Sequence, residues 1–234
     1  MKFTQILSLL VLLLFTTFST QAQLKKGYKL LNKKNYEESI TAFERDIFNN
    51  KKNIAVEAEY NLAKIYFNKD FEDYNLEKAY EYAKSALNRQ LKLKGKELKK
   101  SQNSGLGKLM LENYKRQIVN EAYTVAKREN NYAAYQYFLD TYDGPTPIQL
   151  EKVTIWRNQR GFEEIKKKNS YVRYENFRNR YLIDLQTYTP KTDSLLQMKL
   201  FESFIEENGW SQYSRFASKY PNNVYIKDSA AVAN

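Results

Sequence analysis

The chain has 234 residues, no cysteine and no histidine, and its 38 lysines and arginines outnumber 27 aspartates and glutamates. The missing residue types exclude disulfides, Ser-His-Asp or Cys-His catalysis and zinc sites of the usual ligands. No GxGxxG or phosphate-binding loop is present, and the acidic residues are scattered among lysines, as in FEEIKKK. We therefore expect no enzyme, no catalytic residue, no metal and no cofactor.

Residues 1–22 predict a secretory signal peptide. Lys2 precedes an apolar run over residues 6–15, and small residues precede a cleavage site between Ala22 and Gln23. The run is about half as long as the ~20 residues of a membrane-spanning helix, so no span is expected after cleavage. Export places the protein in the periplasm or at the outer membrane, as in a Gram-negative bacterium, where nucleic acid is a poor partner.

Two helical hairpins follow within residues 23–105. In the first, small and apolar residues recur at helical spacing and Asn35 opens a second helix; the next segment repeats this order. Small residues stand where two helix backbones must approach closely, which only Gly, Ala or Ser permits. These small residues are Gly27 and Ser39 in the first hairpin, and Ala63, Ala79 and Ala86 in the second, where Ala83 aligns with Phe43 of the first.

This order resembles the tetratricopeptide repeat, a helix–turn–helix unit of about 34 residues. The chain departs from that pattern because Gln23 stands where the family often has Trp, Asp46 replaces an Ala and the terminal Pro is missing from both units. The resemblance implies a partner-binding groove lined by the first helices. Its residues here would be Tyr28, Tyr60, Asn61 and Lys64.

A Lys-rich segment comes next, between Leu91 and a stretch rich in Ser, Asn and Gly at residues 101–107. It predicts a short helix followed by a loop, with a subdomain boundary in that loop. The lysines favour a solvated helix face, with contact to an anionic surface as the alternative. They are Lys92, Lys94, Lys96, Lys99 and Lys100.

A repeat of 39 residues is the strongest pattern in the chain. The segment NNYAAYQYFLDTY at 130–142 returns without a gap as NSYVRYENFRNRY at 169–181 and NGWSQYSRFASKY at 208–220. An asparagine and five aromatic positions align in the three copies. The aligned sets are Asn130, Asn169 and Asn208; Tyr132, Tyr171 and Trp210; Tyr135, Tyr174 and Tyr213; Phe138, Phe177 and Phe216; Tyr142, Tyr181 and Tyr220; and Tyr123, Phe162 and Phe201.

The aromatic spacing predicts one face of a short helix in each copy, so the rings are expected in the core and not on a sugar- or base-stacking surface. The aligned asparagines are expected to cap these helices. Tyr137 has no aromatic counterpart and is expected to be exposed. A longer helix should precede the second copy, with an apolar stripe of Ile148, Val153, Trp156, Phe162 and Ile165.

The second array resembles the divergent tetratricopeptide-like repeats of exported bacterial proteins, whose units end in a Y..F...YP pattern that YSRFASKYP at 213–221 matches. Together the two arrays predict an all-α fold, a right-handed α-solenoid of stacked helical hairpins behind the signal peptide. Residues 106–234 would hold three aromatic-rich repeats, with the last cut short because Asn234 aligns with mid-helix positions. This alignment favours an N-terminal piece of a longer protein.

The functional prediction is a non-catalytic exported scaffold or adaptor that binds other proteins or peptides of the cell envelope. The positive charge adds weak attraction to anionic lipid or glycan. Two alternatives stay open. One is a glycan- or peptidoglycan-binding module that stacks sugars on exposed Tyr74, Tyr80 and Tyr137; the other is an interaction arm of a longer envelope protein, with its activity beyond residue 234.

Overall fold

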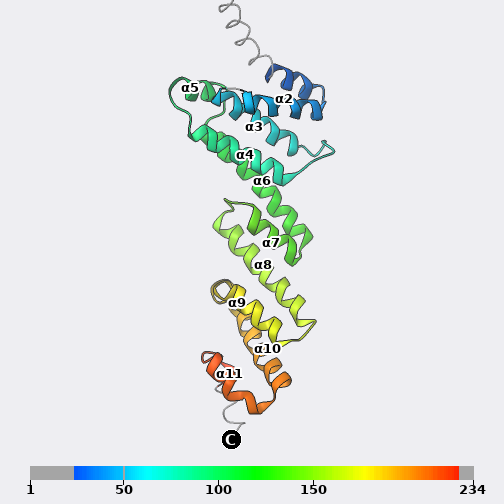
Figure 1. The fold of residues 1–234 in the computed structure, drawn as a ribbon, viewed down its shortest axis with the longest axis vertical. Helices are drawn as coiled ribbons and strands as arrows, with labels where there is room; N and C mark the ends of the chain where they lie inside the picture. Colours follow the sequence, from blue (N-terminus) through cyan, green and yellow to red (C-terminus); the bar gives the residue numbers. More distant parts are fainter. Residues whose placement is uncertain (1–23, 50, 227–234) are drawn as a thin grey trace, which may run out of the picture. The chain divides into compact units, whose positions relative to one another are not determined.

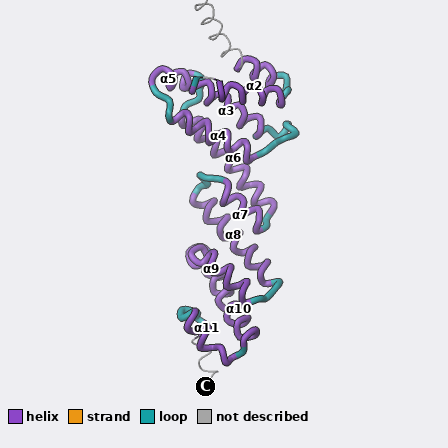
Figure 2. Tube along the Cα trace, in the orientation of Figure 1, coloured by secondary structure: helices purple, strands orange, loops and turns teal. Residues whose placement is uncertain are grey.

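The structure is a computed structural model that describes residues 24–49 and 51–226 (Figure 1). Within these ranges every regular element is a helix, and Figure 2 shows helices joined by loops. The all-α prediction is therefore confirmed. The predicted signal peptide and the predicted interruption at Asn234 lie outside the described residues.

The chain divides into two compact units between Ala122 and Tyr123, inside helix α6. We call them the N-terminal and C-terminal units. The predicted domain boundary between residues 105 and 106 falls in the turn before α6 and stays a prediction. The helices of the N-terminal unit are residues 24–32, α2 (Tyr36–Asn49), α3 (Lys52–Tyr66), α4 (Leu76–Leu91), α5 (Gly95–Asn103) and the first part of α6 (Lys108–Glu129).

Close helix packing builds the N-terminal unit, in which α3 packs against both α2 and α4. A Cβ atom on Gly27 would lie 2.6 Å from the ring of Phe43, so only glycine allows this approach. The Ser39 hydroxyl donates a hydrogen bond of 2.9 Å to the Gly27 carbonyl. The other predicted small positions are fully buried, which confirms their assignment. They are Ala63, Ala79 and Ala86, and Ala83 is fully buried as well.

Successive helices of the C-terminal unit also pack in chain order, with α8 between α7 and α9 and α9 against α10. Helix α9 is longer than the predicted short helix because it continues past a non-helical residue, Tyr181. The elements are the last part of α6, α7 (Tyr132–Thr141), α8 (Pro147–Lys166), α9 (Tyr171–Tyr188), α10 (Pro190–Asn208), the 3-10 helix η1 (Trp210–Gln212) and α11 (Tyr213–Lys219).

Most of the repeated aromatic residues form the core of the C-terminal unit, as predicted, while Tyr123, Tyr132 and Tyr213 are half-buried. Trp210 departs from its column, because it lies in η1 and keeps 49% of its surface exposed. Tyr137 is also 49% exposed, which confirms the expectation for that ring. The buried repeat residues are Tyr135, Phe138 and Tyr142; Phe162, Tyr171, Tyr174, Phe177 and Tyr181; and Phe201, Phe216 and Tyr220.

The prediction that the aligned asparagines are N-caps is wrong by one residue. Asn130 and Asn169 have φ angles of 50° and 34°, so they take the left-handed conformation that ends the preceding helix, which Asn tolerates well. The side-chain oxygen of Asn130 accepts a hydrogen bond of 2.8 Å from the Tyr135 hydroxyl. The cap of α7 is Asn131, while Asn208 is the last residue of α10.

The predicted apolar stripe of α8 needs one correction at its start. Ile148 is 64% exposed, whereas Val153 and Phe162 are buried. Ile148 lies in the exposed first turn of α8, directly after the capping residue Thr146, whose capping box with Gln149 starts the helix. The stripe therefore begins one turn later than the spacing predicts.

Candidate functional site

The four residues predicted to line a groove separate into two places. Tyr28 and Asn61 join a hydrogen-bonded cluster between residues 24–32 and α3. The Tyr28 hydroxyl donates to Glu57 Oε1 at 2.6 Å, and Asn61 Nδ2 donates to the Tyr28 hydroxyl at 2.9 Å. Burial, together with Glu57, raises the pKa of Tyr28. Asn61 itself is only 2% exposed.

Tyr60 and Lys64 lie on a different side of α3, toward α6. The Tyr60 ring packs edge-on against Tyr114 at 5.0 Å between ring centroids. Lys64 is exposed, and its Nζ lies 5.6 Å from the centroid of the Tyr60 ring. The structure thus pairs Tyr60 with Lys64 and Tyr28 with Asn61, and a partner-binding role for the four stays a prediction.

A groove of about 660 Å³ opens between α2 and α4, over α3. We call it the acidic groove because three glutamates and one lysine line it. Its α4 residues recur at helical spacing, which places them on one face of that helix. The lining residues are Glu44, Ile47 and Phe48 of α2, Glu59 and Tyr66 of α3, and Lys78, Glu81, Tyr82 and Ser85 of α4.

Glu59 is the buried charge of the acidic groove, with 3% of its surface exposed. Its Oε1 accepts hydrogen bonds from Ser85 Oγ at 2.7 Å and from Arg89 Nε at 2.6 Å. Its Oε2 is buried and has no hydrogen-bond partner. Burial raises the pKa of Glu59 and outweighs the opposing hydrogen bonds from Ser85 and Arg89. This carboxylate can therefore still accept a donor.

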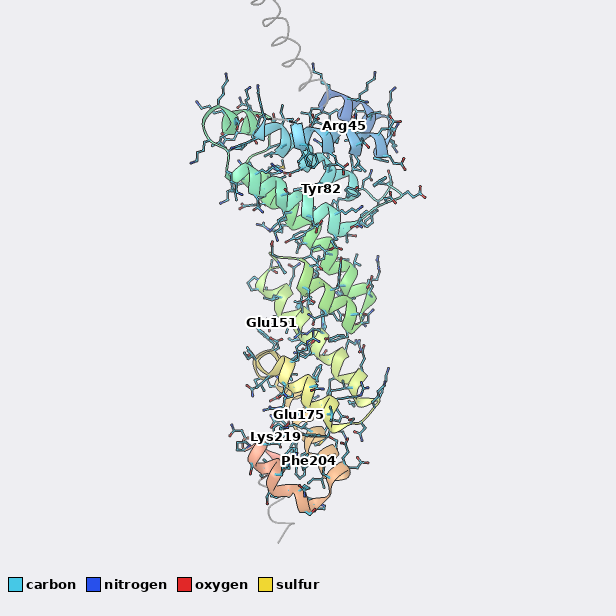
Figure 3. The ribbon with its side chains drawn as sticks, in the orientation of Figure 1. Arg45, Tyr82, Glu151, Glu175, Phe204 and Lys219 are labelled. Atoms are coloured by element: carbon cyan, nitrogen blue, oxygen red, sulfur yellow. The ribbon has the colours of Figure 1, made fainter. Side chains whose placement is uncertain are left out.

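Aromatic rings and a second hydrogen-bonded carboxylate complete the acidic groove. Tyr66 and Tyr82 stack with their ring centroids 5.8 Å apart, and Lys78 Nζ lies 4.9 Å from the Tyr66 centroid. Tyr82, labelled in Figure 3, donates to Glu44 Oε1 at 3.3 Å. Burial raises the pKa of Tyr82 to about 12. The hydroxyl therefore stays protonated at neutral pH and remains a donor.

Phe48 is the most exposed of the large apolar side chains in the described residues, at 87%. It lines the acidic groove together with the half-buried Ile47. Aromatic side chains are enriched at protein-binding surfaces, where they act as anchors. Phe48 was not predicted as a binding residue from the sequence, although a large apolar residue between two polar segments, as in DIFNNKK, was a usable signal.

Polar contacts between successive hairpins repeat in the C-terminal unit. The hydroxyls of Tyr132 and Tyr181 contact each other, and those of Tyr171 and Tyr220 do the same one repeat later. Glu175 accepts hydrogen bonds from the Tyr171 and Tyr220 hydroxyls. Lys219 Nζ lies 2.5 Å from Glu175 Oε1, and both are labelled in Figure 3. This network joins α9 to α11 and serves packing.

The described residues hold no group of three Asp or Glu side chains arranged to bind a metal ion. Across the same residues, every helix is too short or too polar to cross a membrane. Of the three tyrosines expected to be exposed for sugar stacking, only Tyr137 is. Tyr80 is 2% exposed, and the Tyr74 hydroxyl is buried, which corrects that expectation.

Comparison with known proteins adds no relative: no family model, no curated protein and no solved structure matches the chain. The tetratricopeptide resemblance therefore stays a prediction. An all-helical architecture does not by itself identify a ligand, so the evidence for function lies in the surfaces of the molecule.

Proposed function

We propose that the chain is a non-catalytic helical-repeat scaffold that binds other proteins or peptides of the cell envelope after export. The observation that carries this proposal is the acidic groove with Phe48 on its lining. The ring offers an apolar anchor, while the carboxylates of Glu44 and Glu81 supply charge for orientation. This combination suits a polypeptide better than a metal ion or a small cofactor.

The charge of the acidic groove indicates a partner segment with both basic and apolar side chains. Glu44, Glu59 and Glu81 outnumber Lys78 there, although the whole chain is strongly basic. A basic partner would be repelled by most of the surface and attracted at this groove, which gives orientation as well as binding. The accessible carboxylates of Glu44 and Glu81 offer acceptors to a guanidinium or ammonium group of the partner.

The repeated order of helices supports a scaffold role. Hairpins that recur every 39 residues bury their aromatic faces against one another and extend a surface along the chain. As part of the proposal, we infer that each unit is built as a right-handed α-solenoid of the tetratricopeptide type. Arrays of this kind act by presenting a surface and need no catalytic residue.

Binding measurements with variants of the exposed ring test the proposal. Purified residues 23–234 serve as bait in an envelope extract, and each captured protein is then purified and titrated by calorimetry. We expect Phe48→Ala to weaken its affinity by about tenfold or more. The matched control is Leu109→Ala, which removes another exposed side chain, 74% accessible, and should change affinity less than about twofold.

A second variant tests the surface predicted from the sequence. Replacing Tyr60 and Lys64 together by alanine should weaken binding if the partner uses the α6-facing side of α3. Because Tyr60 packs on Tyr114, circular dichroism must first show that this variant is folded. An affinity unchanged both in this variant and in Phe48→Ala would remove the scaffold proposal.

Glycan binding is the alternative that one observation favours, the exposed ring of Tyr137 on α7. It requires retention on insoluble peptidoglycan that survives a salt wash, because attraction by charge alone is screened by salt. Retention that is lost in Tyr137→Ala would select this alternative over the scaffold. The further alternative, an arm of a longer envelope protein, is compatible with either surface.

A further inference from the structure

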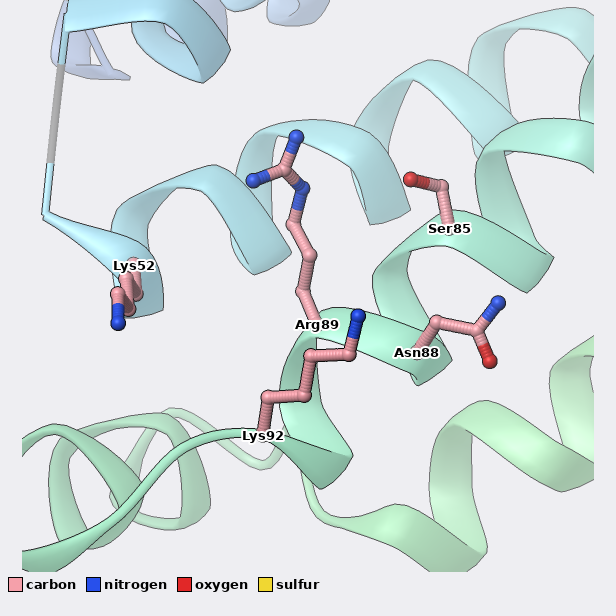
Figure 4. Close-up of a pocket in the computed structure, with 5 residues that line it drawn as sticks. All are labelled: Lys52, Ser85, Asn88, Arg89 and Lys92. Atoms are coloured by element: carbon pink, nitrogen blue, oxygen red, sulfur yellow. The ribbon is translucent and has the colours of Figure 1, made fainter.

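A second hollow, of about 360 Å³, lies beside α4 toward its C-terminal end (Figure 4). We call it the basic pocket. Ser85, Asn88, Arg89 and Lys92 recur at helical spacing on one face of α4, and Lys52 is the first residue of α3. In Figure 4 the Arg89 guanidinium points toward α3, the Lys92 side chain lies beside the base of the Arg89 side chain, and Lys52 stands apart at the start of α3.

The lining of the basic pocket carries three cations and no acid. Arg89 is already compensated, because its Nε donates to the buried Glu59. Lys52 and Lys92 are both exposed, and no acidic side chain of the described residues forms an ion pair with them. The pocket therefore presents two uncompensated positive charges next to a neutral Arg–Glu pair.

The buried Glu59 fixes the position of Arg89, which is the hydrogen-bond donor that the pocket offers. Ser85 and Arg89 both donate to Oε1 of Glu59, and its 3% exposure leaves Glu59 little freedom. It therefore anchors one edge of the Arg89 guanidinium, so the side-chain entropy that a ligand must overcome is reduced. A planar guanidinium held by one nitrogen keeps its terminal nitrogens for a second acceptor.

The start of α3 adds partial positive charge to the same place. The capping residue of this helix, Lys51, makes no side-chain hydrogen bond to the first turn. The backbone N–H groups next to Lys52 thus lack a side-chain acceptor, and a helix N-terminus favours an anion there. This partial charge adds to the charge of the lysine side chains.

We propose that the basic pocket binds a phosphate monoester group. A phosphate dianion matches the two uncompensated lysine charges, and its oxygens can accept paired hydrogen bonds from a guanidinium. A carboxylate would match only one of these charges. The site lies on the other side of Ser85 from the acidic groove, and its ligand is independent of the proposed scaffold function.

Titration with inorganic phosphate tests the site. The full mature chain is titrated by calorimetry at constant ionic strength, with sulfate and acetate as comparisons. We expect saturable one-site binding of both tetrahedral dianions and weaker binding of acetate. In the Lys52→Gln/Lys92→Gln variant the phosphate affinity should fall by about tenfold or more, because two charge-assisted contacts are lost.

The control variant carries the same loss of charge at another place. Lys96→Gln/Lys99→Gln removes two exposed lysines of α5 that do not line the pocket, and its phosphate affinity should stay within about twofold of the parent. Equal losses in the two double variants would show that net charge alone attracts phosphate and would overturn the proposal. Absence of saturable binding by the parent chain would overturn it too.

A vesicle assay distinguishes a phosphate monoester on a lipid headgroup from one on a soluble molecule. Phosphatidic acid displays this group on a lipid, whereas phosphatidylcholine vesicles lack it. Co-sedimentation with phosphatidic acid that is lost in Lys52→Gln/Lys92→Gln, and kept in Lys96→Gln/Lys99→Gln, would identify a lipid headgroup. Phosphate binding in solution without such co-sedimentation would identify a soluble phosphate ester.

Discussion

Two glutamates show how neighbouring donors decide the state of a carboxylate in this chain. Glu59 receives two hydrogen bonds on one oxygen and none on the other, and burial raises its pKa. Burial acts in the same direction on Glu175, but there the hydrogen bonds from Lys219, Tyr220 and Tyr171 outweigh it and lower the pKa. The first carboxylate keeps one oxygen without a hydrogen-bond partner, and the second is held in the packing of its unit.

The lowered pKa of Glu175 predicts acid sensitivity of the C-terminal unit. A carboxylate whose folded pKa is depressed contributes stability above its unfolded pKa, and this stability is lost as pH falls through the folded value. We expect the free energy of unfolding to decrease from about pH 5 to pH 3 and to depend less on pH in Glu175→Gln. Both tryptophans, Trp156 and Trp210, lie in this unit, so urea titrations followed by their fluorescence report on it.

Parallel pH profiles of the parent chain and Glu175→Gln would contradict this role. Glu163→Gln is a suitable control, because Glu163 forms a more exposed pair with Lys166 and should contribute little.

A close helix contact at Gly161 predicts a second residue-scale effect. A Cβ atom there would lie 2.7 Å from the Phe177 ring and 3.0 Å from Tyr132. Overpacking of this kind costs about 1–3 kcal/mol, which offsets the gain in helix propensity of about 1 kcal/mol. We therefore expect Gly161→Ala to leave stability unchanged or to lower it by up to about 2 kcal/mol in urea denaturation. A gain of about 1 kcal/mol would mean that the rings can move aside.

At the scale of elements, the hairpins of the C-terminal unit are joined by a polar contact that repeats with the sequence. Gln136 and Glu175 occupy equivalent positions 39 residues apart, and each accepts from a tyrosine of the next hairpin, Tyr181 and Tyr220 respectively. The residue positions are the same while the acceptor changes from an amide to a carboxylate. The second junction should therefore be the stronger one.

Removal of the two hydroxyls measures this difference. Tyr220→Phe should lower the free energy of unfolding by about 1.5–3 kcal/mol, because it removes a hydrogen bond to a charged group. Tyr181→Phe loses only neutral partners and should cost about 0.5–1.5 kcal/mol. Tyr188→Phe, at an exposed tyrosine of α9, is the control and should stay within about 0.5 kcal/mol. Equal losses at the two junctions would contradict the argument.

Much of each element could be predicted because helical periodicity decides which positions face inward. Gly27 and the aromatic columns needed only that rule. The asparagines were placed one residue off because Asn favours both the left-handed position that ends a helix and the cap that starts the next. The prediction for Ile148 was wrong because this residue lies in the exposed first turn of α8, where periodicity alone does not show which neighbours a side chain meets. The prediction that Trp210 is a core residue was wrong because its segment forms a 3-10 helix.

At the scale of the whole molecule, the candidate sites could not be predicted from helical periodicity. The acidic groove depends on α2 and α4 both packing on α3, which is a tertiary relation. Glu59 lies among apolar residues of α3, where helical spacing alone does not show that Arg89 and Ser85 will meet it. In the sequence, Lys52 and Lys92 of the basic pocket do not differ from lysines of a solvated helix face.

The most direct test of the scaffold proposal is site-specific photo-crosslinking in the native host. A photoreactive phenylalanine analogue replaces Phe48 in the acidic groove, and the same analogue at Ile183, which is 77% exposed in the C-terminal unit, is the control. We predict a discrete protein adduct from position 48 that is absent at position 183 and is lost when Glu81→Lys reverses the charge beside it. No adduct at position 48, or the same adduct at both positions, would contradict the account.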